Sequence, residues 1–195
     1  MTNAENVSEP IAATRAWLEA AVIGLDLCPF ARAVHAARRI RYAESDADNP
    51  EALLDALAAE LHILAAADPG TIETTLLIHP LVLGDFLDYN LFLPSAQAAV
   101  KRLGFTGVIQ IATFHPRYEF AGSAPDDMAN YTNRSPYPML HLLREASVER
   151  AVASHPDTAE IYRKNIETLR RLGRDGWDRL GLTGKSGPIT HVKNQ

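Results

Sequence analysis

Three short strand-like segments alternate with two segments of helical periodicity, and this alternation constrains the fold more than any other feature. Residues 38–44, 72–78 and 107–114 are rich in β-branched and apolar side chains, and amphipathic stretches at 51–67 and 84–103 separate them. Strands that alternate with helices form parallel sheets through right-handed crossovers. The order therefore predicts an α/β fold with a small, mainly parallel, three-stranded sheet and a βαβαβ core.

Helical spacing of apolar residues continues on both sides of this core. It predicts an N-terminal helix over residues 9–23, and a C-terminal helical pair over 139–153 and 157–172. Pro94 predicts an interruption of the helix at 84–103, because proline removes a backbone donor. All the helices are expected to flank the sheet.

The length of 195 residues fits one domain. We expect a loose tail over residues 1–8, a single α/β domain over 9–182, and a second tail over 183–195. The second tail contains an apolar stretch at 189–192 that is compatible with a fourth, edge strand.

Composition limits the classes of function. With 24 acidic against 19 basic residues, the chain has a net charge of −5 and lacks the excess of positive charge that is typical of nucleic-acid-binding proteins. The single cysteine, Cys28, cannot form an intrachain disulfide, which fits a reducing compartment. No apolar run approaches the ~20 residues of a membrane span, and the N-terminus lacks a signal-peptide pattern. We expect a cytoplasmic protein with no membrane partner, and the sequence leaves its oligomeric state open, a homo-oligomer included.

Two of the predicted strands end in the same dipeptide, His79-Pro80 and His115-Pro116. Ligands bind beyond the carboxyl ends of parallel strands, and neighbouring strands would place the two imidazoles side by side there. Such a pair can hold a divalent metal ion or transfer protons. Alternatively, each histidine caps its strand by bonding to local backbone.

The segment that follows His115 is long, aromatic and polar, which is typical of a functional loop. Arg134 precedes the helix expected from Met139, whose N-terminus would help it to hold a carboxylate or phosphate. An ion pair of Arg134 with Asp126 or Asp127 is the alternative. The candidate ligand-binding residues of the loop are Tyr118, Asp126, Asn130, Asn133, Arg134 and Ser135, with Asp127 as an orienting group or ligand.

Two further candidates lie outside this loop. His141 and Glu145 are four residues apart on the helix expected at 139–153, with Arg144 beside them, so they can share a ligand or form an ordinary surface ion pair. Cys28 precedes Pro29 at a helix break. A helix N-terminus would lower the pKa of the thiol and make it a nucleophile, whereas a lone cysteine beside Leu27 is also typical of a small buried hydrophobe.

Several strings resemble one family across about residues 17–171. They are Gly-Leu-Asp-Leu-Cys-Pro-Phe-Ala (24–31), Asp-Phe-Leu-Asp-Tyr-Asn (85–90), Phe-His-Pro-Arg-Tyr-Glu-Phe-Ala-Gly (114–122), Asp126-Asp127, and Thr-Asn-Arg-Ser-Pro-Tyr-Pro-Met-Leu-His-Leu-Leu-Arg-Glu (132–145). The chain resembles the bacterial and plastid family labelled domain of unknown function 1415. The resemblance implies one domain and brings no activity or cofactor.

Three hypotheses follow. The first is an enzyme that acts on a small anionic molecule by acid–base or metal-assisted hydrolysis or group transfer, with His115, His79, Asp127, His141 and Glu145 at the site and Cys28 as an alternative nucleophile. The second is a module that binds a small anion or a peptide. The third is a structural or assembly protein. The first two predict an open pocket at His115, and the third predicts a closed one.

Overall fold

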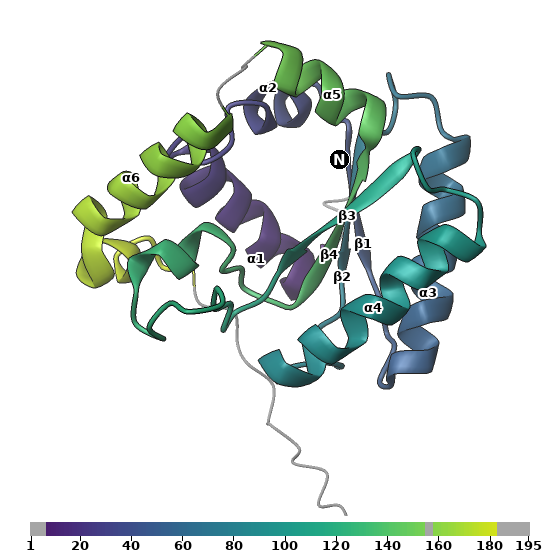
Figure 1. Ribbon diagram of the computed structural model, residues 1–195, viewed down its shortest axis with the longest axis horizontal. Coiled ribbons are helices and arrows are strands. Elements are labelled where there is room, and N and C mark those ends of the chain that lie inside the picture. The colour runs from purple at the N-terminus through teal and green to yellow at the C-terminus, as the bar shows by residue number, and fades with distance from the viewer. Residues whose placement is uncertain (1–6, 155–157, 183–195) are drawn as a thin grey trace, which may run out of the picture.

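The computed structural model describes residues 7–154 and 158–182. It shows a sheet covered by helices on both faces (Figure 1). The elements, in chain order, are α1 (Glu9–Trp17), the π-helix η1 (Leu18–Ile23), α2 (Ala31–Ala36), β1 (Ile40–Glu44), α3 (Pro50–Ala66), β2 (Thr74–Ile78), α4 (Phe86–Arg102), β3 (Ile109–Phe114), the 3-10 helix η2 (Met128–Thr132), β4 (Met139–Arg144), α5 (Glu145–Ser154) and α6 (Thr158–Asp178).

The α/β class is confirmed, but the sheet is mixed rather than parallel. It has four strands in the order β1-β2-β4-β3. β1 and β2 pair in parallel, while β4 pairs antiparallel with both β2 and β3. Strands β1, β2 and β3 therefore run in one direction, as the βαβαβ pattern predicts, and β4 is inserted between β2 and β3.

The prediction of one helix over residues 139–153 is wrong. Residues 139–144 form β4, and α5 begins only at Glu145. A short apolar run such as Met-Leu-His-Leu-Leu fits a buried helix or a buried strand equally well. Strands on both sides supply hydrogen-bond partners for β4, and this tertiary context decides in favour of the strand. The possible edge strand at 189–192 lies outside the described residues.

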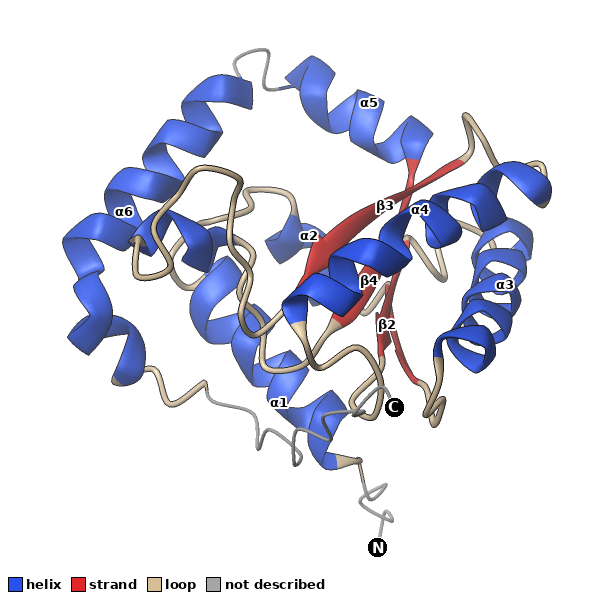
Figure 2. Ribbon diagram, turned by 60° about the horizontal axis from the view of Figure 1, so that its bottom comes forward, coloured by secondary structure: helices blue, strands red, loops and turns tan. Residues whose placement is uncertain are grey.

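Helices α3 and α4 cover one face of the sheet (Figure 2). Each begins at a side-chain cap: Asn49 accepts from the amide of Ala52, and Asp85 accepts from the amides of Leu87 and Asp88. Their apolar side chains pack on the strands in one continuous core. The interruption predicted at Pro94 does not occur. Pro94 lies on the exposed side of α4, where water can bind the carbonyl group that it leaves without a partner.

The other face of the sheet is covered by α1, η1, α2, α5 and α6 (Figure 1). Gly24 ends η1, and a Cβ atom there would lie 2.3 Å from the backbone oxygen of Ala20. Only glycine fits this close approach without a shift of the backbone. A second core, which includes Trp17, Leu76 and Met139, holds this layer to the strands.

Candidate functional site

The two histidines that end β2 and β3 lie at the same edge of the sheet, but they are not on neighbouring strands. Strand β4 runs between them, so the expectation that they lie side by side is wrong. The ring of Tyr89 contacts both, at centroid distances of 5.9 Å from His79 and 5.2 Å from His115. Both histidines are 0% exposed. The pocket is therefore closed at His115.

Both rings bind the backbone that leads from β2 to α4. His79 bonds through Nδ1 to the oxygen of Val82, and His115 through Nε2 to the oxygen of Leu83, both at 3.1 Å. Nδ1 of His115 accepts from the amide of Arg117. Leu83 has a φ of 57°, an unfavourable conformation for leucine. The two histidines thus hold a strained turn in place.

Burial sets the charge state of these histidines. It lowers the pKa of His79 and of His115 to about 4, so both are neutral near pH 7. Nε2 of His79 is buried without a hydrogen-bond partner in the described part of the chain. Among the described residues no group of three or more His, Cys, Asp and Glu side chains could hold a metal ion.

The loop between β3 and β4 is held together by its own polar side chains. Asn130 is fully buried; its Oδ1 accepts from the amide of Phe120 and the hydroxyl of Ser123, and its Nδ2 donates to Ala124. Asp127 accepts from an amide at the start of η2 and pairs with Arg170 of α6 at 3.0 Å. These residues organise the loop.

The remaining candidates of the loop are placed as follows. Nδ2 of Asn133 donates to the backbone oxygen of Thr113, and the hydroxyl of Ser135 donates to the backbone oxygen of Tyr137. Tyr118 packs against Phe86 and Phe120. Asp126 is exposed.

Arg134 binds neither Asp126 nor Asp127. It donates to the backbone oxygens of Tyr118 and Pro125. The segment that follows it leads into strand β4, so the helix N-terminus expected next to Arg134 does not exist.

The proposed helical pair of His141 and Glu145 is also corrected. His141 lies in the middle of β4, whereas Glu145 is the first residue of α5. The guanidinium of Arg144 donates to the backbone oxygens of Leu64 and Ala67 at the end of α3, and of Ile72 in the segment that leads to β2. It therefore binds carbonyl groups at the end of a helix, a common use of arginine.

Cys28 differs from the expectation of an activated thiol. Burial raises its pKa, and this outweighs the opposite effect of the amides of Phe30 and Ala31. The thiol therefore stays protonated near pH 7 and is a poor nucleophile.

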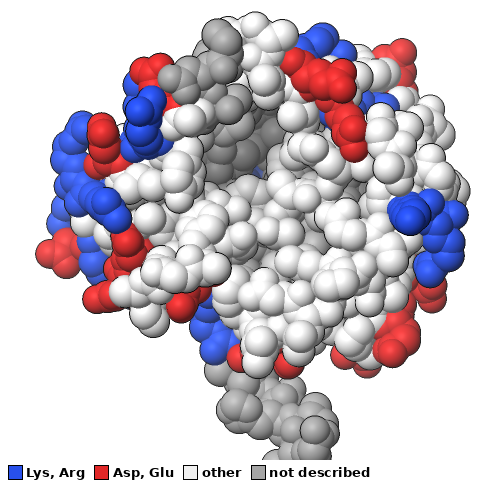
Figure 3. Space-filling model, in the orientation of Figure 1, with Lys and Arg blue, Asp and Glu red and all other residues white. Residues whose placement is uncertain are grey.

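A large opening lies on the sheet face that carries α1, α2, α5 and α6. It is a cavity of about 510 Å³. Figure 3 shows the molecule hollowed between α2, α5 and the sheet, with coloured charged side chains mainly outside the hollow. The wall is almost entirely apolar and includes Leu18, Val22, Val34, Leu76, Ala112, Phe114, Leu143, Val148 and Ile161.

His141 of β4 is a polar residue on the floor of this cavity. Its Nε2 lies 2.7 Å from the hydroxyl of Thr74, and that hydroxyl donates to the backbone oxygen of Leu142 at 2.6 Å. Since the hydroxyl has one proton, it must accept from His141, which places the ring proton on Nε2. Burial lowers the pKa of His141 to about 4, so Nδ1 carries a lone pair near pH 7. Nδ1 bonds to no residue within 7–154 or 158–182.

Sequence reasoning found His141 but missed the cavity around it. Thr74 was a usable signal, because it is a polar residue in a strand that is buried along its whole length. The π-helix was not predictable from the periodicity, yet it contributes Leu18 and Val22 to the wall. π-helical turns occur often at functional sites.

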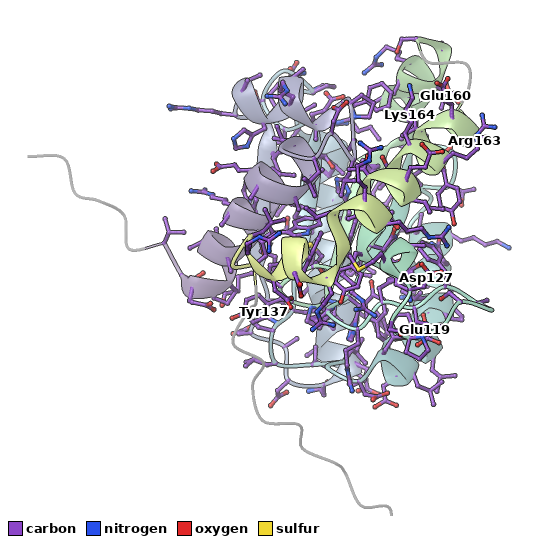
Figure 4. The ribbon with its side chains drawn as sticks, turned by 90° about the vertical axis from the view of Figure 1, so that its left-hand side faces the viewer. Glu119, Asp127, Tyr137, Glu160, Arg163 and Lys164 are labelled. Carbon is purple, nitrogen blue, oxygen red and sulfur yellow. The ribbon has the colours of Figure 1, made fainter. Side chains whose placement is uncertain are left out.

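The charged residues of α6 lie away from the cavity floor. Figure 4 shows Glu160, Arg163 and Lys164 together near the start of α6, far from Glu119 and Asp127 on the loop. Lys164 pairs with Glu160 at 2.9 Å. None of these three residues of α6 is among those that line the cavity.

The fold and the cavity define a class: an α/β protein with a mixed four-stranded sheet and an apolar cavity on one sheet face. The chain belongs to the family described as "Protein of unknown function (DUF1415)", whose model matches residues 9–179. No curated protein and no solved structure matches the chain. None of the helices in the described ranges has the length and hydrophobicity to cross a membrane.

Proposed function

We propose that this protein binds a small, mainly apolar molecule that carries one hydrogen-bond donor. The observation that carries the proposal is the cavity of about 510 Å³ with the acceptor nitrogen of His141 on its floor. Ligand pockets of proteins have volumes of roughly 300–1,000 Å³, apolar walls and a few polar groups that orient the ligand. Both features support a binding function.

The chemistry of the floor selects the ligand class. A neutral imidazole with its proton on Nε2 offers only an acceptor at Nδ1, which favours a hydroxyl or amide donor. An anion would lose its hydration against walls that are mainly apolar, which costs several kcal/mol, roughly 2–7 even for an uncharged polar group. Among the lining residues, the side-chain donors Asn133, Arg144 and Asn165 already donate to backbone oxygens. The geometry thus favours a binding module over the acid–base enzyme, whose expected histidines, His79 and His115, are fully buried.

The test uses two fluorescent probes of similar shape, 2-naphthol and naphthalene. Both fit an apolar cavity of this size, but only 2-naphthol can donate to His141. We expect saturable binding of both, with 2-naphthol about fivefold tighter, since one hydrogen bond contributes about 1 kcal/mol and a tenfold change corresponds to about 1.4 kcal/mol. His141→Phe should remove the difference between the probes.

Ala112→Phe provides the second variant. Ala112 lies on β3 opposite His141 and lines the cavity, so a phenyl ring there should abolish binding of both probes. Ala98→Phe, at an exposed position on α4, is the matched control and should bind both probes as the wild type does. Equal affinities for the two probes in the wild type, or binding that survives Ala112→Phe, would contradict the proposal.

A further inference from the structure

A second, smaller pocket lies where the loop between β3 and β4 meets the end of α6. Its volume is about 240 Å³. Four charged residues line it, namely Arg117, Arg134, Arg174 and Asp178, together with apolar residues such as Trp177. Segment 131–134 and Trp17 lie between the two spaces: Thr132 and Asn133 line the apolar cavity, Tyr131 and Arg134 line this pocket, and Trp17 lines both.

Arg134 is the fixed cation of this pocket. Its Nε donates to the oxygen of Tyr118 at 3.2 Å, and its Nη2 donates to that of Pro125 at 2.7 Å. Its Cζ also lies 4.2 Å from the ring centroid of Tyr131. Both hydrogen-bond acceptors are neutral, and no carboxylate in the described part of the chain pairs with Arg134. A positive charge is therefore held in one orientation without a compensating negative charge.

The other two arginines each form an exposed ion pair, and Arg117 also donates to the backbone oxygen of Gly84 at 2.7 Å. Arg174 pairs with Asp178 at 3.1 Å, with side chains 67% and 51% exposed. Arg117 pairs with Asp85 at 3.1 Å, with side chains 50% and 45% exposed. Exposed ion pairs contribute little, about 0–1 kcal/mol, so a bound anion can compete with these carboxylates.

We propose that this pocket binds the phosphate group of a small phosphomonoester. Among the side chains that line it, three guanidinium groups and one carboxylate leave an excess of two positive charges, which a phosphate dianion neutralises. The planar fork of arginine matches phosphate oxygens, and three forks around one space suit a tetrahedral oxyanion better than a planar carboxylate. Trp17 is the one lining residue that the two spaces share, and the charged groups of this site do not line the apolar cavity, so the proposal does not depend on the ligand of that cavity.

Tryptophan fluorescence is a suitable readout, because the chain has two tryptophans and both Trp17 and Trp177 line this pocket. Inorganic phosphate is the probe, titrated near pH 7.5 at constant ionic strength, with acetate and chloride as separate arms. ³¹P line broadening of the same samples gives a second readout that does not depend on the indole rings. We expect a saturable response to phosphate that is at least tenfold weaker for acetate and absent for chloride.

Arg134→Gln should weaken phosphate binding at least tenfold, and Arg174→Gln at least threefold. Arg174→Gln is included because it should fold normally: the bonds that it removes, from Arg174 to Asp178, are on the surface. Arg102→Gln, at the exposed end of α4, is the matched control and should bind phosphate as the wild type does. Ala112→Phe should also retain phosphate binding.

The proposal is overturned if both readouts show no saturable response to phosphate. It is equally overturned if Arg134→Gln and Arg174→Gln bind phosphate with wild-type affinity, or if acetate and phosphate bind equally well. None of these outcomes affects the naphthol titrations, which report on the other cavity.

Discussion

The two faces of the sheet are built for different purposes. On one face, α3 and α4 pack directly against the strands, and Leu140 and Leu142 of β4 are 0% exposed beneath them. On the other face, His141 and Leu143 of the same strand line a cavity of about 510 Å³. Alternate residues of one strand thus enter a sealed core and an open cavity, since successive side chains point to opposite faces.

The helices explain this difference. α3 and α4 each bury five residues. α5 buries none, and the large buried side chains of α6 are Leu169 and Trp177. The apolar side chains of α5, such as Val148, face the cavity rather than a packed partner. One face therefore supplies stability, and the other leaves apolar surface available to a ligand.

The sharpest test of this contrast compares neighbouring residues of β4. Leu142→Ala should lower the free energy of unfolding by about 3 kcal/mol, because it leaves a void in a close-packed core. Leu143→Ala should lower it by only about 1 kcal/mol, because it enlarges a space that already exists. Urea denaturation of both variants measures the difference, and equal losses would show that the two faces are packed alike.

The buried histidines His79 and His115, at one edge of the sheet, should make the stability of the protein sensitive to acid. Burial lowers the pKa of His79 and His115 from 6.5 to about 4, so the folded state binds fewer protons than the unfolded chain between these values. Stability should therefore be full above pH 6.5 and fall as the pH drops toward 4. At pH 5 the loss should be about 2 kcal/mol for each histidine.

Urea denaturation at pH 7 and pH 5 checks this prediction. Asp85 and Asp127 do not interfere, because their pKa values are lowered from 3.8 and they titrate below this window. His141, whose pKa is also lowered to about 4, adds a similar dependence that is common to the wild type and the variant. His115→Asn should remove about 2 kcal/mol of the pH dependence. An unchanged difference between pH 7 and pH 5 in this variant would show that His115 is not buried as a neutral ring.

Tyr89 connects the two buried histidines, which its ring contacts, to strand β4. Its hydroxyl donates to the backbone oxygen of Met139 at 2.8 Å, so Tyr89→Phe leaves that buried oxygen with one partner fewer. We expect a loss of about 1 kcal/mol in the free energy of unfolding. A loss close to zero would show that water reaches this edge and replaces the bond.

The smallest effect is expected from filling the cavity. Ala112→Phe should change the free energy of unfolding by less than about 1 kcal/mol, because the new ring enters free space rather than a packed core, where added volume costs roughly 1–3 kcal/mol. Thermal unfolding without probes measures the change. A loss of several kcal/mol would mean that the space is already filled.

The sequence carried enough information for the helix–strand alternation and for the direction of β1, β2 and β3, because local periodicity reports on these elements. It did not reveal the place of β4, since strand pairing depends on partners that are far apart in the chain. The twin His-Pro ends were recognised, but their burial follows from packing against Tyr89 and the turn before α4. Cavities between layers leave almost no local signal. The polar residues Thr74 and His141 within mainly apolar strands are the signal that exists, and of these only His141 was singled out, for a different role.

The central claim is that the cavity binds a ligand through Nδ1 of His141, and the ¹⁵N resonances of this ring test it most directly. At pH 7 without ligand, we expect a neutral ring with the proton on Nε2. Titration with 2-naphthol should shift the Nδ1 resonance to lower frequency in a saturable way, while naphthalene should leave it nearly unchanged. A ring with its proton on Nδ1, or an Nδ1 resonance that stays constant at saturating 2-naphthol, would contradict the account.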